Sequence, residues 1–336
     1  MNIIADFHED FINLIFEKIN YLKQMEFHFE EFSEWKPKRI NSLNKIIELR
    51  KSKGDDFSYE SDALEEKILM RDYRRDMVHL YFNLMHKIPA QKPRKIFKCS
   101  SFSCSKELES GLTALEKKID EGADLFPHLS RKIFDPVFSD YMFYDYGLTH
   151  FHLGTKQSTK NPLLIGGTKE IVYALLNETS CYLIRIDEHG KWDDIALLED
   201  LKKDFPEVLD PWKISGEPLW KPTGKERKEM LHFQINSYIE IGGENYMCPG
   251  MGVDGVGTSS LAVMMMNSWF HHYARIQKAI VTMLEKNLDK IETDIGYKLQ
   301  DMDLVLIKLE PIVVFDKNNE LFIDFDPKIG SMKLRK

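Results

Sequence analysis

The most informative part of the sequence is Tyr141-Met-Phe-Tyr-Asp-Tyr-Gly-Leu-Thr-His-Phe-His-Leu153. The apolar and aromatic residues in it are typical of a β-strand over residues 141–153. Side chains in a strand alternate between its two faces, so His150 and His152 share one face and Phe151 points to the other. The sequence therefore predicts a sheet that carries two imidazoles side by side on one surface.

The sequence on either side of this stretch predicts further strands and two helices. Apolar runs and helical spacings, each bounded by turn residues, follow one another along residues 93–204. In chain order they predict a strand at 94–102, a helix at 105–121, strands at 141–153, 171–176 and 181–187, and a helix at 192–203. Residues 93–204 are therefore expected to form a compact α+β unit, in the order strand, helix, strand meander, helix.

The parts of the chain before and after this unit have a different character. Residues 1–92 show the helical spacing of apolar residues, and Pro93 marks their end because proline disfavours a helix just before it. Residues 205–336 predict a hairpin around Gly242-Gly243, one long helix and three C-terminal strands. We therefore expect a mixed α+β protein with a helical N-terminal region, the unit 93–204 and a C-terminal α+β region.

The amino-acid composition and net charge exclude some classes of protein. Hydrophobic residues make up 43% of the chain and aromatic residues 12%, which is enough for a sizeable core and argues against global disorder. The net charge of −8 argues against nucleic-acid binding across the whole surface, but a local basic patch can still attract a polyanion. The sequence shows no signal-peptide pattern and no apolar window long enough to span a membrane, so we expect a cytoplasmic protein without membrane contact.

A third histidine, His189, directly follows the predicted strand 181–187. A strand meander would bring it back to the face that carries His150 and His152. Neighbouring imidazoles suit two tasks: they bind a metal ion, or one takes up a proton while another gives one up near neutral pH. The alternative is three unrelated packing or surface histidines, since the chain contains 11.

Two patterns suggest a metal or a cofactor, and both are incomplete. The His-x-His pair with a distant histidine is similar to the ligand set of cupins, but Lys156 or Gln157 stands where a cupin has its glutamate. Gly250-Met-Gly-Val-Asp-Gly255 fits the dinucleotide fingerprint, but Pro249 breaks the preceding strand, and Arg275 stands where an acid is needed. We therefore expect neither a bound metal nor a cofactor.

The segment from Pro93 to Leu198 resembles the RelE superfamily of bacterial toxin ribonucleases, and its YafQ-type members in particular. In that family two short elements each supply a histidine, and an aromatic residue follows the second. The matching elements here are Phe151-His152-Leu153, Ile184-Arg-Ile-Asp-Glu-His189 and Trp192. The resemblance covers about a third of the chain, and the loop after its first histidine is longer here and contains Lys156 and Lys160.

The resemblance implies a small α/β fold that cleaves mRNA without a metal ion. The site residues that it implies are two acid–base histidines, His152 and His189, a helper histidine, His150, a phosphate contact, Arg185 or Lys156, and a base-stacking or positioning residue, Trp192. The implied partners are RNA and an antitoxin or regulatory protein. The implied setting is a bacterial toxin–antitoxin or phage-defence system.

Two other hypotheses fit the same residues. One is a non-catalytic regulatory or interaction protein that retains the fold without the chemistry. The other is a metal-dependent enzyme that uses His150, His152 and His189 as ligands. Both enzyme hypotheses require the three imidazoles to converge in one cleft, which is a property of the folded chain.

Overall fold

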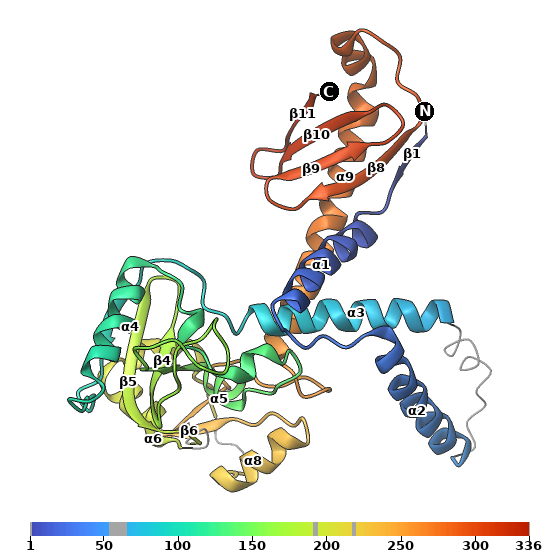
Figure 1. Ribbon diagram of the computed structural model, residues 1–336. Helices are drawn as coiled ribbons and strands as arrows, with labels where there is room; N and C mark the ends of the chain where they lie inside the picture. The colour runs from blue at the N-terminus through green and yellow to red at the C-terminus, as the bar shows by residue number, and fades with distance from the viewer. Residues whose placement is uncertain (1, 54–65, 191–193, 217–219, 336) are drawn as a thin grey trace. The chain divides into compact units, whose positions relative to one another are not determined.

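The structure is a computed structural model that describes residues 2–53, 66–190, 194–216 and 220–335 (Figure 1). The chain has a mixed α+β fold, as expected, and divides into two compact units. One unit is formed by residues 82–263, and the other by residues 1–81 together with 264–336. The segment 93–204 lies wholly within the first unit. In the described ranges, no helix is both long enough and apolar enough to cross a membrane.

The unit 82–263 is built on a four-stranded sheet. Its strands are β2 (Lys95–Lys98), β3 (Leu148–His152), β4 (Glu170–Leu176) and β5 (Ser180–Glu188), in the spatial order β2-β5-β4-β3. Strand β2 runs parallel to β5, whereas β3, β4 and β5 form the expected antiparallel meander. His150 lies opposite Tyr173 and His152 lies opposite Ile171, so these four side chains occupy one face of the sheet.

Short helices and a hairpin complete this unit. They are α4 (Glu109–Glu121), α5 (Tyr141–Tyr146), α6 (Ala196–Asp204), α7 (Pro206–Leu209), α8 (Gly224–His232), the 3₁₀ turns η2 (Phe126–His128), η3 (Arg131–Phe134) and η4 (Asp210–Trp212), and the strands β6 (Ile239–Ile241) and β7 (Glu244–Tyr246). Helix α4 lies against β2, α5 against β3 and α6 against β5. Gly122 ends α4 with a φ of 69°, a left-handed conformation that favours glycine.

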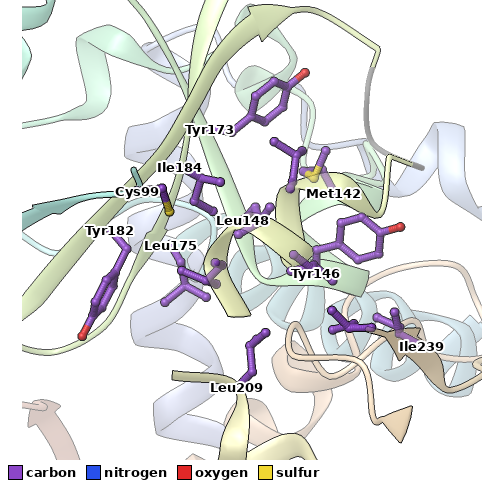
Figure 2. Close-up of a cluster of buried hydrophobic side chains, with 14 of the residues drawn as sticks. Cys99, Met142, Tyr146, Leu148, Tyr173, Leu175, Tyr182, Ile184, Leu209 and Ile239 are labelled. Carbon is purple, nitrogen blue, oxygen red and sulfur yellow. The ribbon is translucent and has the colours of Figure 1, made fainter. Parts of the chain in front are cut away.

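One face of the sheet packs into a buried cluster with α6 and the hairpin β6–β7. The cluster includes Leu148, Ile171, Tyr173, Leu175, Tyr182 and Ile184 from the strands and Leu197, Leu198 and Leu201 from α6. Figure 2 shows Leu148 and Leu175 within this cluster, with Leu209 and Ile239 contributed by segments after the sheet. Because side chains of β3 alternate, His150 and His152 lie on the same face as Leu148.

The sequence pattern predicts one strand over residues 141–153, and this prediction is wrong for the first half of the segment. Residues 141–146 form the helix α5, and only residues 148–152 form β3. Asp140 caps α5 by accepting a hydrogen bond from the N–H of Phe143, and Gly147, with a φ of 71°, ends it. The prediction that His150 and His152 share one face of a strand is confirmed, because both residues lie in β3.

The unit of residues 1–81 and 264–336 has a five-stranded sheet. Its strands, in spatial order, are β1 (Ile3–Ala5), β8 (Met302–Lys308), β9 (Ile312–Asp316), β10 (Leu321–Asp326) and β11 (Ser331–Arg335). Its helices are α1 (Phe7–Gln24), α2 (Phe32–Lys51), α3 (Glu66–Met85) and α9 (Ser260–Ile295), of which α3 and α9 also contribute residues to the other unit. Strands β8, β9 and β10 were expected from the sequence, whereas β1 and β11 were not.

Candidate functional site

Three histidines converge beside strands β3 and β4. The ring centroids of His150 and His152 are 6.5 Å apart, those of His150 and His189 are 6.0 Å apart, and those of His152 and His189 are 5.0 Å apart. The register explains this. His152 lies opposite Ile171 and Ile171 lies opposite Asp187, so the residues that follow β5 return to the histidine end of β3.

The backbone of Thr168 holds two of the rings. Its N–H donates to Nδ1 of His152 at 3.1 Å, and its carbonyl oxygen accepts from Nε2 of His189 at 3.3 Å. Since a peptide N–H only donates and a carbonyl only accepts, the neutral form of each ring carries its proton on Nε2. His152 is therefore left with an N–H donor for a ligand, and His189 is left with a proton acceptor at Nδ1.

Burial keeps two of the rings neutral. It lowers the pKa of His152 to about 4, and the rings of His189 and His150 act in the same direction. Burial also lowers the pKa of His150, an effect that the Asp140 carboxylate opposes. Nδ1 of His128, itself buried, donates to the carbonyl oxygen of His152 at 2.9 Å and so fixes the backbone beneath that ring.

Two adjoining hollows open at these rings. One, which we call the helix hollow, has a volume of about 560 Å³ and is lined by residues of α5, α8, β3 and β4. The other, the arm hollow, has a volume of about 970 Å³ and is lined by residues 129–132 and by the loop after β3. Ser130, Lys132 and His189 line both hollows, so the two meet where the imidazoles converge.

The loop of residues 154–168, which we call the arm, forms one wall of the arm hollow. It folds back on itself, and the N–H of Gly166 donates to the carbonyl oxygen of Lys156 at 2.7 Å. A Cβ on Gly154 would lie only 2.0 Å from the carbonyl oxygen of Gly166, so the close approach requires glycine at position 154. Lys156 and Lys160 both line the hollow and give this wall a positive charge.

Helix α8 contributes to the other side of the site. Lys228 and His232 are four residues apart, which places them on one side of the helix, and both line the helix hollow. A buried ion pair between Arg227 and Asp145, whose side chains are 8% and 3% exposed, joins α8 to α5. The hydroxyl of Tyr141 lies 3.3 Å from Nδ1 of His232. The helix hollow therefore has a wall made of two helices that are tied together.

Of the other predicted site residues, Lys156 lies at the site, Arg185 does not, and Trp192 is not described. Lys156 lines the arm hollow. Arg185 lines neither hollow. Its guanidinium is paired with Asp200 at 2.5 Å and lies 3.8 Å from a carboxylate oxygen of Asp194. Trp192 lies outside the described residues.

Two lysines at the site were missed by the sequence interpretation. Lys132 lines both hollows, and its ammonium lies 5.2 Å from the centroid of the Phe138 ring. Lys87 is buried in a small cavity that His150 also lines, and it donates to the carbonyl oxygen of Phe138 at 3.0 Å. Burial lowers the pKa of Lys87 to about 8. Both come from segments far from β3 in the sequence, so no local spacing connects them to the histidines.

Comparison with known proteins gives no relative: no family model, curated protein or solved structure matches the chain significantly. Within the described ranges, no three His, Cys, Asp or Glu side chains are arranged to hold a metal ion. The candidate site is therefore defined by its own geometry, which is a cluster of three imidazoles at the junction of two hollows with lysines on their walls.

We expect NMR detection of the side-chain nitrogens to show that the neutral forms of His152 and His189 are both the Nε2–H tautomer. The His152 ring should titrate at about pH 4, and in the urea-unfolded chain it should titrate near pH 6.5. Because the folded chain binds fewer protons between these values, the free energy of unfolding should fall as the pH drops from 6.5 to 4. An Nδ1–H tautomer at either ring would contradict the contacts with Thr168.

Proposed function

We propose that this protein is a metal-independent endoribonuclease whose site is the junction of the helix hollow and the arm hollow. The observation that carries the proposal is the convergence of three imidazoles, 5.0 to 6.5 Å apart, beside a lysine that lines both hollows. Cleavage of an RNA phosphodiester needs an acceptor for the proton of the 2′-hydroxyl and donors for the phosphate oxygens. These are the groups that the junction offers.

In the proposed reaction, Nδ1 of His189 takes the proton of a ribose 2′-hydroxyl, and the 2′-oxygen attacks the adjacent phosphorus. The bond from phosphorus to the 5′-oxygen breaks, the 5′-oxygen takes up a proton from solvent water, and a 2′,3′-cyclic phosphate remains. His152 acts as a neutral electrophile, because its Nε2–H donates to a phosphate oxygen as negative charge develops there. His150 is a helper ring beside the other two, and burial lowers its pKa and keeps it neutral.

Cations along the arm hollow support the proposal for a phosphate backbone. Lys132, Lys156 and Lys160 line this hollow together with Arg131. Since the whole chain has a net charge of −8, this local cluster rather than the overall charge would attract RNA. We assign the phosphate contact to Lys132 and Lys156 instead of Arg185, whose guanidinium is held by carboxylates.

The proposal retains the RelE-like interpretation of residues 93–204. These residues contain, in order, β2, α4, the meander β3–β5 and α6, and the two histidines of the resemblance have their rings 5.0 Å apart. In this proposal the partners are RNA and an antitoxin or regulatory protein, in a toxin–antitoxin or phage-defence setting. Trp192 stays a proposed base-stacking residue.

Incubation of the purified protein with a 5′-labelled single-stranded RNA in the presence of EDTA tests the proposal. Cleavage should proceed without a divalent metal and should leave 2′,3′-cyclic phosphate ends. A 2′-deoxynucleotide placed 5′ to a cleaved bond should block cleavage at that bond, because the attacking oxygen is missing. Cleavage that needs an added metal would favour the metal-dependent alternative, and no cleavage under any condition would reject the proposal.

Removing three lysines of the arm hollow should weaken the salt dependence of RNA binding. The logarithm of the binding constant falls with the logarithm of the salt concentration, and each phosphate contact contributes about 0.7 to the steepness of this fall for a single strand. The slope of the variant Lys132→Ala/Lys156→Ala/Lys160→Ala should therefore be less steep by about 2. Fluorescence anisotropy with a labelled RNA measures this in a cleavage-deficient background. The matched control replaces Lys106, Lys117 and Lys203, which are exposed and line neither hollow. An equal loss in the control would contradict a role for the arm hollow.

A further inference from the structure

The helix hollow and the arm hollow differ in the chemistry of their walls. The helix hollow is lined by the apolar or aromatic side chains of Phe138, Tyr141, Met142, Ile171 and Tyr173, and also by polar, charged and imidazole side chains: Ser130, Lys132, Ser139, Asp140, His150, His189, Lys228 and His232. The arm hollow has only the aliphatic side chains of Leu129, Leu164 and Ile165 and no Phe, Tyr or Trp among its described lining residues; its other side chains are polar, cationic or imidazole: Ser130, Arg131, Lys132, His152, Lys156, Gln157, Ser158, Thr159, Lys160 and His189. The helix hollow therefore suits a flat group with apolar faces and polar edges, and the cations of the arm hollow suit a charged backbone.

Tyr141 and His232 form a fixed aromatic corner in the helix hollow. Their ring centroids are 5.1 Å apart with the ring planes at 81°, and the Tyr141 hydroxyl lies 3.3 Å from Nδ1 of His232. Tyr141 begins α5 and His232 ends α8, and the buried Arg227–Asp145 pair joins these two helices. A ring that is held in place before binding loses little conformational freedom when a ligand stacks on it.

We infer that the helix hollow is a nucleobase subsite in which Tyr141 stacks on a base that flanks the cleaved phosphate. This inference rests on the proposed function and adds that cleavage depends on the identity of that base. The volume of about 560 Å³ lies within the range of small-molecule sites. Stacking on an aromatic side chain is the usual way in which proteins hold a base that has left its own stack.

The continuity of the two hollows supports this occupant. Ser130, Lys132 and His189 line both, so a base in the helix hollow places its own phosphate at the imidazoles and the rest of the strand along the arm. Asp140 and Lys228 also line the helix hollow and supply a hydrogen-bond acceptor and a donor. Because the edges of the four bases differ in their donors and acceptors, such a site discriminates among them.

Mapping of cleavage positions in a random-sequence RNA tests the inference. The wild-type protein should prefer particular bases on one side of the cleaved bond. Tyr141→Ala should flatten this preference and lower kcat/KM for the preferred sequence about 10-fold or more. Tyr141→Phe, which keeps the ring, should restore the preference. Phe233→Ala is the matched control, because Phe233 is 74% exposed, lies next to His232 in sequence and does not line the hollow.

Binding of small ligands separates this inference from the proposed function. Calorimetry should show that adenosine or cytidine 3′-monophosphate binds more tightly than ribose 5-phosphate, which has no base, and that Tyr141→Ala removes most of the difference. Wild-type cleavage without a base preference, or a preference that survives Tyr141→Ala, overturns the inference and leaves the nuclease in place. If RNA is not cleaved, the proposed function fails, and equal binding of the nucleotides and the sugar phosphate then overturns the subsite as well.

Discussion

Alanine at His152 or at His189 is expected to slow RNA cleavage by about 10²- to 10⁴-fold, the effect usual for the loss of a general base or of a donor that stabilises developing charge. His189→Ala removes the acceptor for the 2′-hydroxyl proton, and His152→Ala removes the Nε2–H donor that the Thr168 backbone leaves for the phosphate. Both groups act on the same step, so the double variant should be little slower than the slower single variant. Single-turnover cleavage of a labelled RNA measures all three rates.

Matched variants separate the chemistry from general effects on the fold. His150→Ala should slow cleavage less than either of the other two, because the proposed reaction gives this ring no proton to move. His271→Ala should cleave as the wild type does, since this exposed residue of α9 lies in the other unit and lines neither hollow. Equal cleavage by the wild type and the variants at His152 and His189 would remove these histidines from the mechanism. An inactive wild type of normal fold would favour the non-catalytic interaction protein.

The expected effect in cells follows from the same substitutions. If the toxin setting holds, induced expression of the wild type should slow growth, and expression of the His152→Ala/His189→Ala variant should not. Equal growth of the two strains at equal protein levels would remove most of the support for a toxin, while leaving the cleavage assay as the test of the enzyme.

The strands of the meander could be predicted because burial leaves a local signature. Strands β4 and β5 are apolar runs that end at turn residues, and the sequence pattern predicted both to within a residue or two. Helix α5 could not be distinguished from a strand in the same way. It has only six residues, most of them aromatic, and such residues pack equally well in a short buried helix. The residues that identify this segment as a helix are its N-cap, Asp140, and its C-cap, Gly147.

The convergence of the three histidines could be predicted because two of them lie on a strand and the third directly follows one. His150 and His152 are linked by strand period, and His189 is linked to them by the meander. Lys132 reaches the same place from a 3₁₀ turn, and the sequence gives no spacing that relates it to β3. The role of Thr168 is also hidden from the sequence, because it depends on a peptide group that every residue but proline carries. The positions of Lys132 and Thr168 at the site depend on long-range packing, which a local sequence pattern does not show.

Arg185 is a residue that the sequence predicted at the site and that the structure pairs elsewhere. A cation on β5 near the histidine element was expected to contact phosphate. Its partner Asp200 lies on α6, which packs against β5, and the two side chains form a direct ion pair. A positive charge that is already neutralised attracts a polyanion weakly. The sequence shows that both residues exist, but only the packing of α6 on the sheet pairs them.

The ion pair between Arg227 and Asp145 is the buried interaction on which the helix wall of the site depends. Both side chains are almost fully buried, and Nη1 of Arg227 lies 3.4 Å from the hydroxyl of Tyr146. Burial raises the pKa of Asp145, and the guanidinium of Arg227 opposes that effect. Each charge is therefore tolerated in the interior because the other is present, and removal of one leaves the other without compensation.

Asp145→Ala and Arg227→Ala should each lower the free energy of unfolding by about 3–5 kcal/mol, which urea denaturation measures. The apolar double variant Asp145→Leu/Arg227→Met should recover most of this loss, since it leaves no unpaired charge. Removal of the exposed Lys169–Glu188 pair is the matched control and should change stability little. If the double variant were as unstable as the single variants, packing rather than charge would hold α8. If all of them were as stable as the wild type, α8 would not depend on this pair, and the fixed wall inferred for the helix hollow would lose its support.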